Sequence, residues 1–139
     1  MTPTTAVSPE ILRRVCGFWA TGIAVITGTA SDGSPKGLAV NSFTSLSLDP
    51  PLILFAPAAS STTWPAIRDT GRFAVNILAA DQAAVSGVFA KSGGDKFSNI
   101  TLLPSSDGLP HLDGAVARMV CGVEVIHPGG DHDIVVGRV

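Results

Sequence analysis

The sequence predicts a mainly β fold, an antiparallel β-barrel of about six strands with short helices at its ends. Short runs of β-branched and apolar residues recur along the chain and are separated by turn-forming residues, which is typical of hairpin-connected strands. Only three stretches have helical spacing, and they do not alternate regularly with the strand-like runs. A parallel sheet of the Rossmann type is therefore not expected.

The N-terminal part of the chain is predicted to contain a flexible tail, residues 1–7, and one helix. Ser8, Pro9 and Glu10 are typical of a helix start, because a serine cap precedes a proline at the first helical position and an acid in the first turn. The helix is expected to end at residues 21–22. Its predicted apolar face consists of Ile11, Val15, Phe18 and Trp19.

The remaining elements are predicted from residue 22 onward. The predicted strands cover residues 22–29, 37–40, 52–56, 73–78, 116–126 and a stretch that starts at 134. The first two form a hairpin around a turn, and the continuous apolar run 52–56 predicts a strand buried on both faces. One short helix is predicted over 64–69, and Asp81 is expected to cap another. Residues 91–114 are expected to form a loop, and 127–131 a turn.

One domain over residues 8–139 accounts for all these elements, because 139 residues is a typical length for a single domain. The chain stops at Val139 within a strand pattern and without a turn, which predicts a truncated C-terminus.

The composition excludes several functional classes. Charged residues make up 14% of the chain, against about 25% in average soluble domains, so part of the surface is expected to be covered in a homodimer. The net charge of −2 and the lack of a basic run argue against nucleic-acid binding. No leader pattern or long apolar run is seen, which predicts a cytoplasmic protein without a membrane span.

The sequence lacks the common catalytic and nucleotide-binding motifs. It has no GxGxxG after a strand, no P-loop and no HExxH. Cys16 and Cys121 are far apart and outside any CxxC pair, so buried, inert thiols are expected. His111 is expected to be solvated, and Trp19 and Trp64 to lie in the core or in an interface.

Two polar stretches are candidate binding sites. Residues 39–45 place Asn41 and Ser42 beside Ala39 and Phe43, which combines hydrogen-bond donors with small and flat apolar surface suited to a flavin ring. An ordinary Asx or Ser turn is the alternative. Residues 60–63 supply hydroxyls at a helix start, where phosphate can bind, and plain N-capping is the alternative.

Two further stretches contain titratable side chains. Lys91, Lys96 and Phe97 lie in a glycine-containing loop and are candidates for phosphate neutralisation and ring covering, with a solvated loop as the alternative. His132 stands between two aspartates, which can hold one tautomer and direct a donor toward a nicotinamide or its ribose. A surface turn is the alternative. A metal site formed with His127 is not expected, because no further His or Cys lies nearby.

Taken in order, these stretches resemble the short-chain flavin reductase family. The resemblance covers the chain from Ile11 to Val139. The segments that carry it are 18–27 (FWATGIAVIT), 41–51 (NSFTSLSLDPP), 60–63 (SSTT), 71–78 (GRFAVNIL), 96–97 (KF) and 130–132 (GDH).

The resemblance implies an antiparallel Greek-key split barrel that binds FMN, and a homodimer with a flavin near each side of the interface. It also implies site residues. Ala39, Val40, Asn41 and Ser42 would line the isoalloxazine, Ser60, Ser61, Thr62 and Thr63 would meet the phosphate, and Lys96, Phe97 and Phe89 would close over the flavin. In the GDH triplet, Asp131 would be a cofactor-binding residue and His132 would act with the nicotinamide as the catalytic residue.

The implied activity is hydride transfer from NADH or NADPH to FMN or FAD, with the reduced flavin supplied to a separate flavin-dependent monooxygenase. A split-barrel protein that binds flavin without turnover is the alternative. An oxidase of the pyridoxamine-phosphate type would need a basic cluster for the substrate phosphate, and few Lys or Arg residues lie near the candidate site.

Overall fold

The computed structural model describes residues 6–139, so the predicted tail lies largely outside the described residues. The order of elements is α1 (Pro9–Cys16), β1 (Ala24–Thr29), β2 (Pro35–Val40), β3 (Thr44–Ser47), β4 (Leu52–Phe55), α2 (Trp64–Arg68), β5 (Arg72–Ile77), α3 (Ala83–Ala90), β6 (Ala117–Gly129) and β7 (His132–Arg138). Every helix within this range is too short or too polar to cross a membrane.

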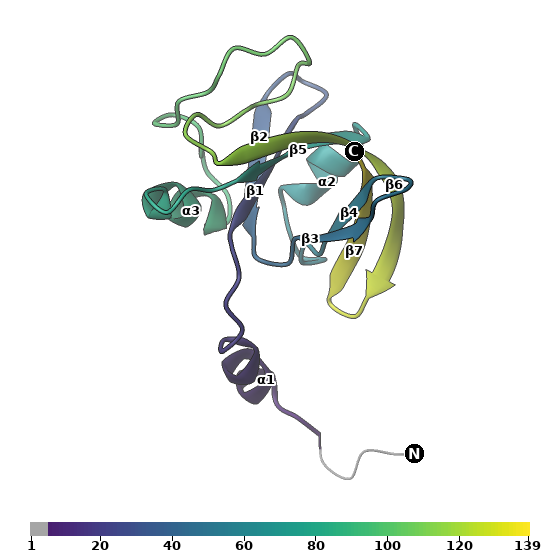
Figure 1. Ribbon diagram of the computed structural model, residues 1–139. Helices are drawn as coiled ribbons and strands as arrows, with labels where there is room; N and C mark the ends of the chain where they lie inside the picture. Colours follow the sequence, from purple (N-terminus) through teal and green to yellow (C-terminus); the bar gives the residue numbers. More distant parts are fainter. Residues whose placement is uncertain (1–5) are drawn as a thin grey trace.

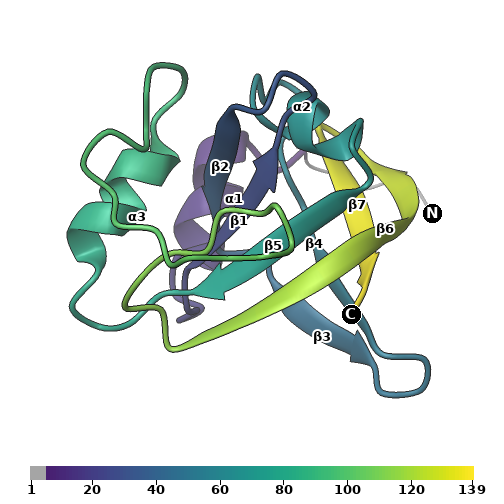
Figure 2. The ribbon, with the colours of Figure 1, turned by 90° about the horizontal axis from the view of Figure 1, so that it is seen from above.

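The seven strands form one antiparallel sheet in the order β2-β1-β5-β6-β7-β4-β3. The sheet curls on itself, as Figure 2 shows from above, and its buried apolar residues form the core. β2 and β3 are consecutive in the sequence but lie at opposite ends of the strand order. The barrel is therefore open between these two edge strands, and the predicted mainly β, antiparallel split barrel is confirmed.

The core fills the barrel because inward-facing residues alternate along the strands. Phe55 contacts Trp64 and Phe73 edge to face, with ring centroids 5.2 and 5.3 Å away. Trp64 and Ile67 are the buried residues of α2, which packs on β1, β2 and β5. Trp64 is thus a core residue, as predicted.

Helix α1 stands away from the barrel and is joined to β1 by an extended segment (Figure 1). Ser8 caps it, and the Ser8 hydroxyl accepts a hydrogen bond from Ile11 N at 3.3 Å. The helix ends at Cys16, earlier than predicted, because Gly17 caps it. None of its residues is buried, and Phe18 and Trp19 are 85% and 79% exposed. Cys16 is also exposed, so the prediction of two buried thiols is wrong for it.

Three other predictions need correction. β4 is buried on one face only, since Ile53 and Phe55 are buried while their neighbours are half-exposed. Asp81 does not cap α3. Gln82 occupies the cap position and accepts a hydrogen bond from Ala79 N through its side chain at 2.9 Å. Residues 127–129 continue β6 instead of turning, so the β6–β7 hairpin turns at residues 130–131.

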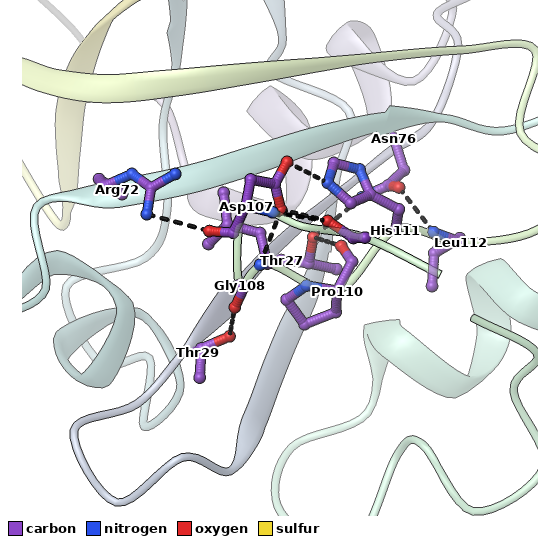
Figure 3. Close-up of polar contacts among 11 residues, drawn as sticks. Thr27, Thr29, Arg72, Asn76, Asp107, Gly108, Pro110, His111 and Leu112 are labelled. Atoms are coloured by element: carbon purple, nitrogen blue, oxygen red, sulfur yellow. Dashed lines mark hydrogen bonds and ion pairs between the residues drawn. The ribbon is translucent and has the colours of Figure 1, made fainter. Parts of the chain in front are cut away.

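Residues 101–114, named here the Asp107 loop, cover β1 and β5 (Figure 3). Thr27 Oγ1 donates to Pro110 O at 2.6 Å, and Leu112 N donates to the Asn76 side chain at 2.9 Å. Both Thr27 and Asn76 are fully buried, so the loop satisfies polar groups that the barrel would otherwise leave unpaired. A stretch without regular secondary structure is therefore fixed to the sheet by side-chain hydrogen bonds.

The Asp107 loop also contains a hydrogen-bonded histidine–carboxylate pair. His111 Nε2 lies 2.7 Å from Asp107 Oδ2, and the His111 side chain is 13% exposed, so the prediction of a solvated histidine is wrong. The Ser105 hydroxyl, with Leu109 N–H and His111, lowers the pKa of Asp107 to about 2. Arg72 on β5 donates to the Asp107 carbonyl at 3.2 Å. Together these contacts hold the loop across the outside of the barrel.

Candidate functional site

A cavity of about 450 Å³, named here the first cavity, lies where the barrel is open. Four segments that are distant in sequence form its walls: the end of β2 with the residues after it, residues 56–63, α3 with the residues after it, and the start of β7. The predicted site residues that line it are Ala39, Val40, Asn41, Ser42, Ser60, Ser61, Thr62, Thr63, Phe89, Lys96 and His132. Phe97 and Asp131 are the two predicted residues that do not line it.

The first wall follows from the way the chain leaves β2. Ser42 Oγ accepts a hydrogen bond from Ala56 N at 2.9 Å and donates to Ala56 O at 3.3 Å, which ties this wall to the end of β4. The Ser42 hydroxyl is therefore engaged by the protein itself. The Asn41 side chain is exposed and makes no hydrogen bond within residues 6–139, so its amide is free to meet a ligand.

In the second wall, residues 60–63, the structure shows which hydroxyl bonds to the backbone at the helix start and which hydroxyls can meet a ligand. Ser61 Oγ accepts hydrogen bonds from Thr63 N at 3.2 Å and from Trp64 N at 3.1 Å. These bonds use the N–H groups that the phosphate hypothesis requires at the helix start, and α2 has only five residues. In residues 6–139, the hydroxyl groups of Ser60, Thr62 and Thr63 make no hydrogen bond within the protein. The Ser61 hydroxyl thus bonds the backbone N–H groups before and at the start of α2, and the other three hydroxyls remain for a ligand.

The third wall consists of α3 and the residues after it. Phe89 is buried and meets Phe97 edge to face, with the ring centroids 5.1 Å apart. Lys96 Nζ donates to the Gly37 carbonyl on β2 at 3.2 Å. Burial lowers the pKa of Lys96, because the charged ammonium loses solvent. An ammonium group so placed still has donors for an anionic ligand.

The fourth wall is the start of β7. His132 Nδ1 lies 2.7 Å from Asp131 Oδ1, and the His132 side chain is 47% exposed. Its hydrogen bond with His132 lowers the pKa of Asp131. Asp131 therefore contacts His132 and not the cavity. Backbone bonds from Ala59 N to Asp131 O (2.8 Å) and from Asp133 N to Pro57 O (3.0 Å) fix this hairpin against residues 57–60.

Phe97 lines a second cavity of about 310 Å³, which adjoins the first. Thr62, Thr63 and Lys96 belong to both cavities, so the two share a wall. The remaining lining residues of the second cavity include Lys36, Gly37, Gly93 and Gly94. In residues 6–139, no group of three His, Cys, Asp or Glu side chains is arranged to hold a metal ion.

Sequence reasoning missed some residues of the first cavity. Ser86 and Ala90 lie on α3 with Phe89, at helical positions that share one face. That spacing is a usable signal once Phe89 is a candidate. Ala58 and Pro57 carry no signal, because only the fold brings residues 57–60 against His132.

Comparison with known proteins identifies the family. The model for the flavin reductase like domain matches residues 16–139. The reductase subunit HsaB of a flavin-dependent monooxygenase from Rhodococcus jostii is 43% identical over 134 residues, which cover 96% of this chain and 68% of the relative. The NADH-dependent FMN reductase SmoA of Agrobacterium fabrum is 41% identical over 127 residues, 91% of this chain and 72% of the relative.

A solved structure is similar over the whole fold. The NADH:FAD oxidoreductase of Streptomyces globisporus superposes with a TM-score of 0.87 and 36% identity, and the match covers 99% of this chain and 84% of that one. The barrel, the cavity at its open seam and these relatives agree: this chain belongs to the flavin reductase-like family.

Proposed function

We propose that the chain is a flavin reductase that transfers hydride from NADH or NADPH to FMN or FAD in the first cavity. The observation that carries this proposal is the convergence of the four candidate segments on one cavity. The related proteins from Agrobacterium fabrum and Streptomyces globisporus, named for reducing FMN and FAD with NADH, support the same activity.

The chemistry of the cavity fits a flavin mononucleotide unit. Small side chains, Ala39, Ala56, Ala58 and Ala90, leave room for a flat ring. The free hydroxyls of Ser60, Thr62 and Thr63, together with the Lys96 ammonium, supply donors and positive charge for a phosphate. The Asn41 amide supplies donors for the ring's polar edge. Ser42 and Ser61 would hold the two walls in place through their bonds to backbone.

The protein's contribution to the reaction is orientation. A bound flavin supplies the ring nitrogen that accepts the hydride, and no protein acid or base is required for that transfer. The side chains of the cavity would restrict the position of one ring and would leave one side open to a second. His132, half-exposed at the cavity wall and oriented by Asp131, would donate a hydrogen bond to the nicotinamide cofactor.

The reduced flavin would then leave for a separate oxygenase component. The Rhodococcus jostii relative is named as the reductase subunit of such a monooxygenase. A wide, open cavity with few charged partners is compatible with reversible flavin binding.

The chain is also proposed to act as a homodimer in the cytoplasm. The apolar side chains of the α1 segment, Ile11, Leu12, Val15, Phe18 and Trp19, are more than half exposed and would pack against a second copy.

Oxidation of NADH and NADPH by the purified protein, with and without added FMN or FAD, tests the proposal. A reductase oxidises a nicotinamide only when flavin is present, and the comparison identifies both cofactors. Tight flavin binding without turnover would instead establish a non-catalytic flavin-binding protein. If the protein shows no flavin binding and no turnover, the assignment of the first cavity is refuted.

A further inference from the structure

The second cavity begins where the phosphate end of a flavin is expected. Thr62, Thr63 and Lys96 form the wall that both cavities share. FAD is FMN extended at its phosphate by an adenylate group. A ligand whose first phosphate contacts the shared wall can therefore continue directly into the second cavity.

The second cavity carries the charge that a second phosphate needs. The lysines Lys36 and Lys96 both line it, whereas Lys91 lines only the first cavity. Asp95 is the single acid in the lining. Its Oδ1 accepts a hydrogen bond from Phe97 N at 2.9 Å, so this oxygen is already bonded within the local turn. The Asp32 carboxylate accepts hydrogen bonds from Ser34 N and Ser34 Oγ at 2.9 and 2.6 Å, and these bonds, with the nearby charge of Lys36, lower the pKa of Asp32.

The same cavity has surfaces suited to a flat base. Phe97 supplies an aromatic ring, which Phe89 fixes from the other side by an edge-to-face contact. Gly93 and Gly94 have φ values of +72° and +76° and contribute bare backbone. Gly37 also lacks a side chain, and a Cβ there would lie 2.6 Å from Phe89.

We propose that the second cavity takes the adenylate half of FAD, and that Lys36 is a specificity-determining residue that favours FAD over FMN. This inference rests on the proposed function, because it requires the flavin phosphate at Thr62 and Thr63. NADH also contains an adenylate group. The shared wall favours FAD, since His132, the residue assigned to the nicotinamide, lines the first cavity only.

The test compares dissociation constants of FMN and FAD, measured by flavin fluorescence without a nicotinamide, for the wild-type protein, Lys36→Ala and Lys36→Arg. Lys36→Ala is expected to raise the Kd for FAD about threefold to fivefold relative to the Kd for FMN, the scale of a partly exposed charge contact. Lys36→Arg is expected to keep the wild-type ratio. The matched control is Lys91→Ala, which is expected to change both constants by the same factor.

The other outcomes separate the alternatives. An unchanged FAD-to-FMN ratio in Lys36→Ala, or a wild-type protein that binds FMN but not FAD, overturns the adenylate site and leaves the proposed function standing. A raised KM for NADH in Lys36→Ala at saturating FMN, with an unchanged flavin ratio, assigns the cavity to NADH and also overturns the proposal. A wild-type protein that binds neither flavin refutes the proposed function itself.

Discussion

Lys96 Nζ donates a 3.2 Å hydrogen bond to the carbonyl of Gly37, and this bond joins the loop after α3 to strand β2. The two residues are 59 positions apart in the sequence. Their contact places the ammonium on the wall between the two cavities. One hydrogen bond thereby connects the barrel to the group proposed to neutralise the flavin phosphate.

Lys96→Met is expected to weaken FMN binding roughly tenfold, because it removes a partly desolvated cation from the proposed phosphate site. Riboflavin, which lacks the phosphate, should bind the variant and the wild-type protein alike. Fluorescence titrations with both ligands provide the measurement. Equal losses for FMN and riboflavin would mean that Lys96 has only a structural role.

The lowered pKa of Lys96 gives FMN binding an expected pH dependence. Desolvation favours the neutral amine, so the ammonium is lost at a pH below its ordinary value of 10.5. FMN affinity should therefore decline as the pH rises toward that value, with a smaller decline for riboflavin. Titrations at increasing pH with both ligands measure this difference. A parallel decline for both ligands would point to the flavin ring and not to Lys96.

Gly37→Ala is expected to destabilise the protein by about 1–3 kcal/mol, because the new Cβ would lie 2.6 Å from Phe89 Cε1 and 3.3 Å from Phe97 Cζ. Flavin affinity should fall with it, since both rings belong to cavity walls. Chemical denaturation and flavin titration give the two readouts. Gly87→Ala in α3 is the matched control. A Cβ added at Gly87 would have nothing within 4 Å, so the alanine should stabilise the helix by up to ~1 kcal/mol.

Asp107 is expected to contribute to unfolding in acid. Its folded pKa of about 2 is below the ordinary value of 3.8, so its stabilising effect is complete above pH 3.8 and is lost as the pH falls toward 2. Denaturation curves across that range should show a steeper loss of stability for the wild-type protein than for Asp107→Asn. Identical slopes would show that the Ser105 and His111 contacts do not favour the ionised form.

Six of the seven strands were predictable, because their apolar periodicity reflects the barrel interior directly, whereas the short edge strand β3 was not, because none of its residues is buried. β1, β2 and β5 lie within a few residues of the predicted ranges, since Val25, Ile26 and Val75 face the core on both sides of the sheet. The end of α1 was not predictable from apolar spacing. Phe18 and Trp19 continue the helical pattern, yet no part of the described chain covers them.

The first cavity was largely predictable as a set of residues, and the resemblance supplied their roles. The second cavity was not, because Lys36 lies in a stretch that reads as an ordinary turn and strand. Lys36 and Lys96 line the same cavity only because tertiary packing brings them together. The same holds for Asp107 and His111, whose side chains meet only because the loop folds back over β1 and β5. The role of Ser61 was ambiguous for a local reason, since helix capping and phosphate binding give the same sequence pattern.

His132→Asn is expected to lower the rate of NADH oxidation at least tenfold while it leaves the Kd for FMN within about twofold, the separation that distinguishes a nicotinamide contact from a flavin contact. Steady-state kinetics combined with flavin titration measure both quantities. Asp131→Asn should have a smaller effect in the same direction, because it only orients His132. A large loss of FMN affinity in His132→Asn would place the histidine on the flavin instead.

The most direct test of the central claim is anaerobic rapid mixing of NADH with the protein and FMN, following the loss of oxidised-flavin absorbance. The wild-type protein should reduce the flavin rapidly, and Ala58→Trp, which fills the first cavity, should abolish the reduction. Ala80→Trp is the matched control, because Ala80 is exposed and lines neither cavity. Unimpaired flavin reduction by Ala58→Trp would contradict the assignment of the first cavity as the reaction site.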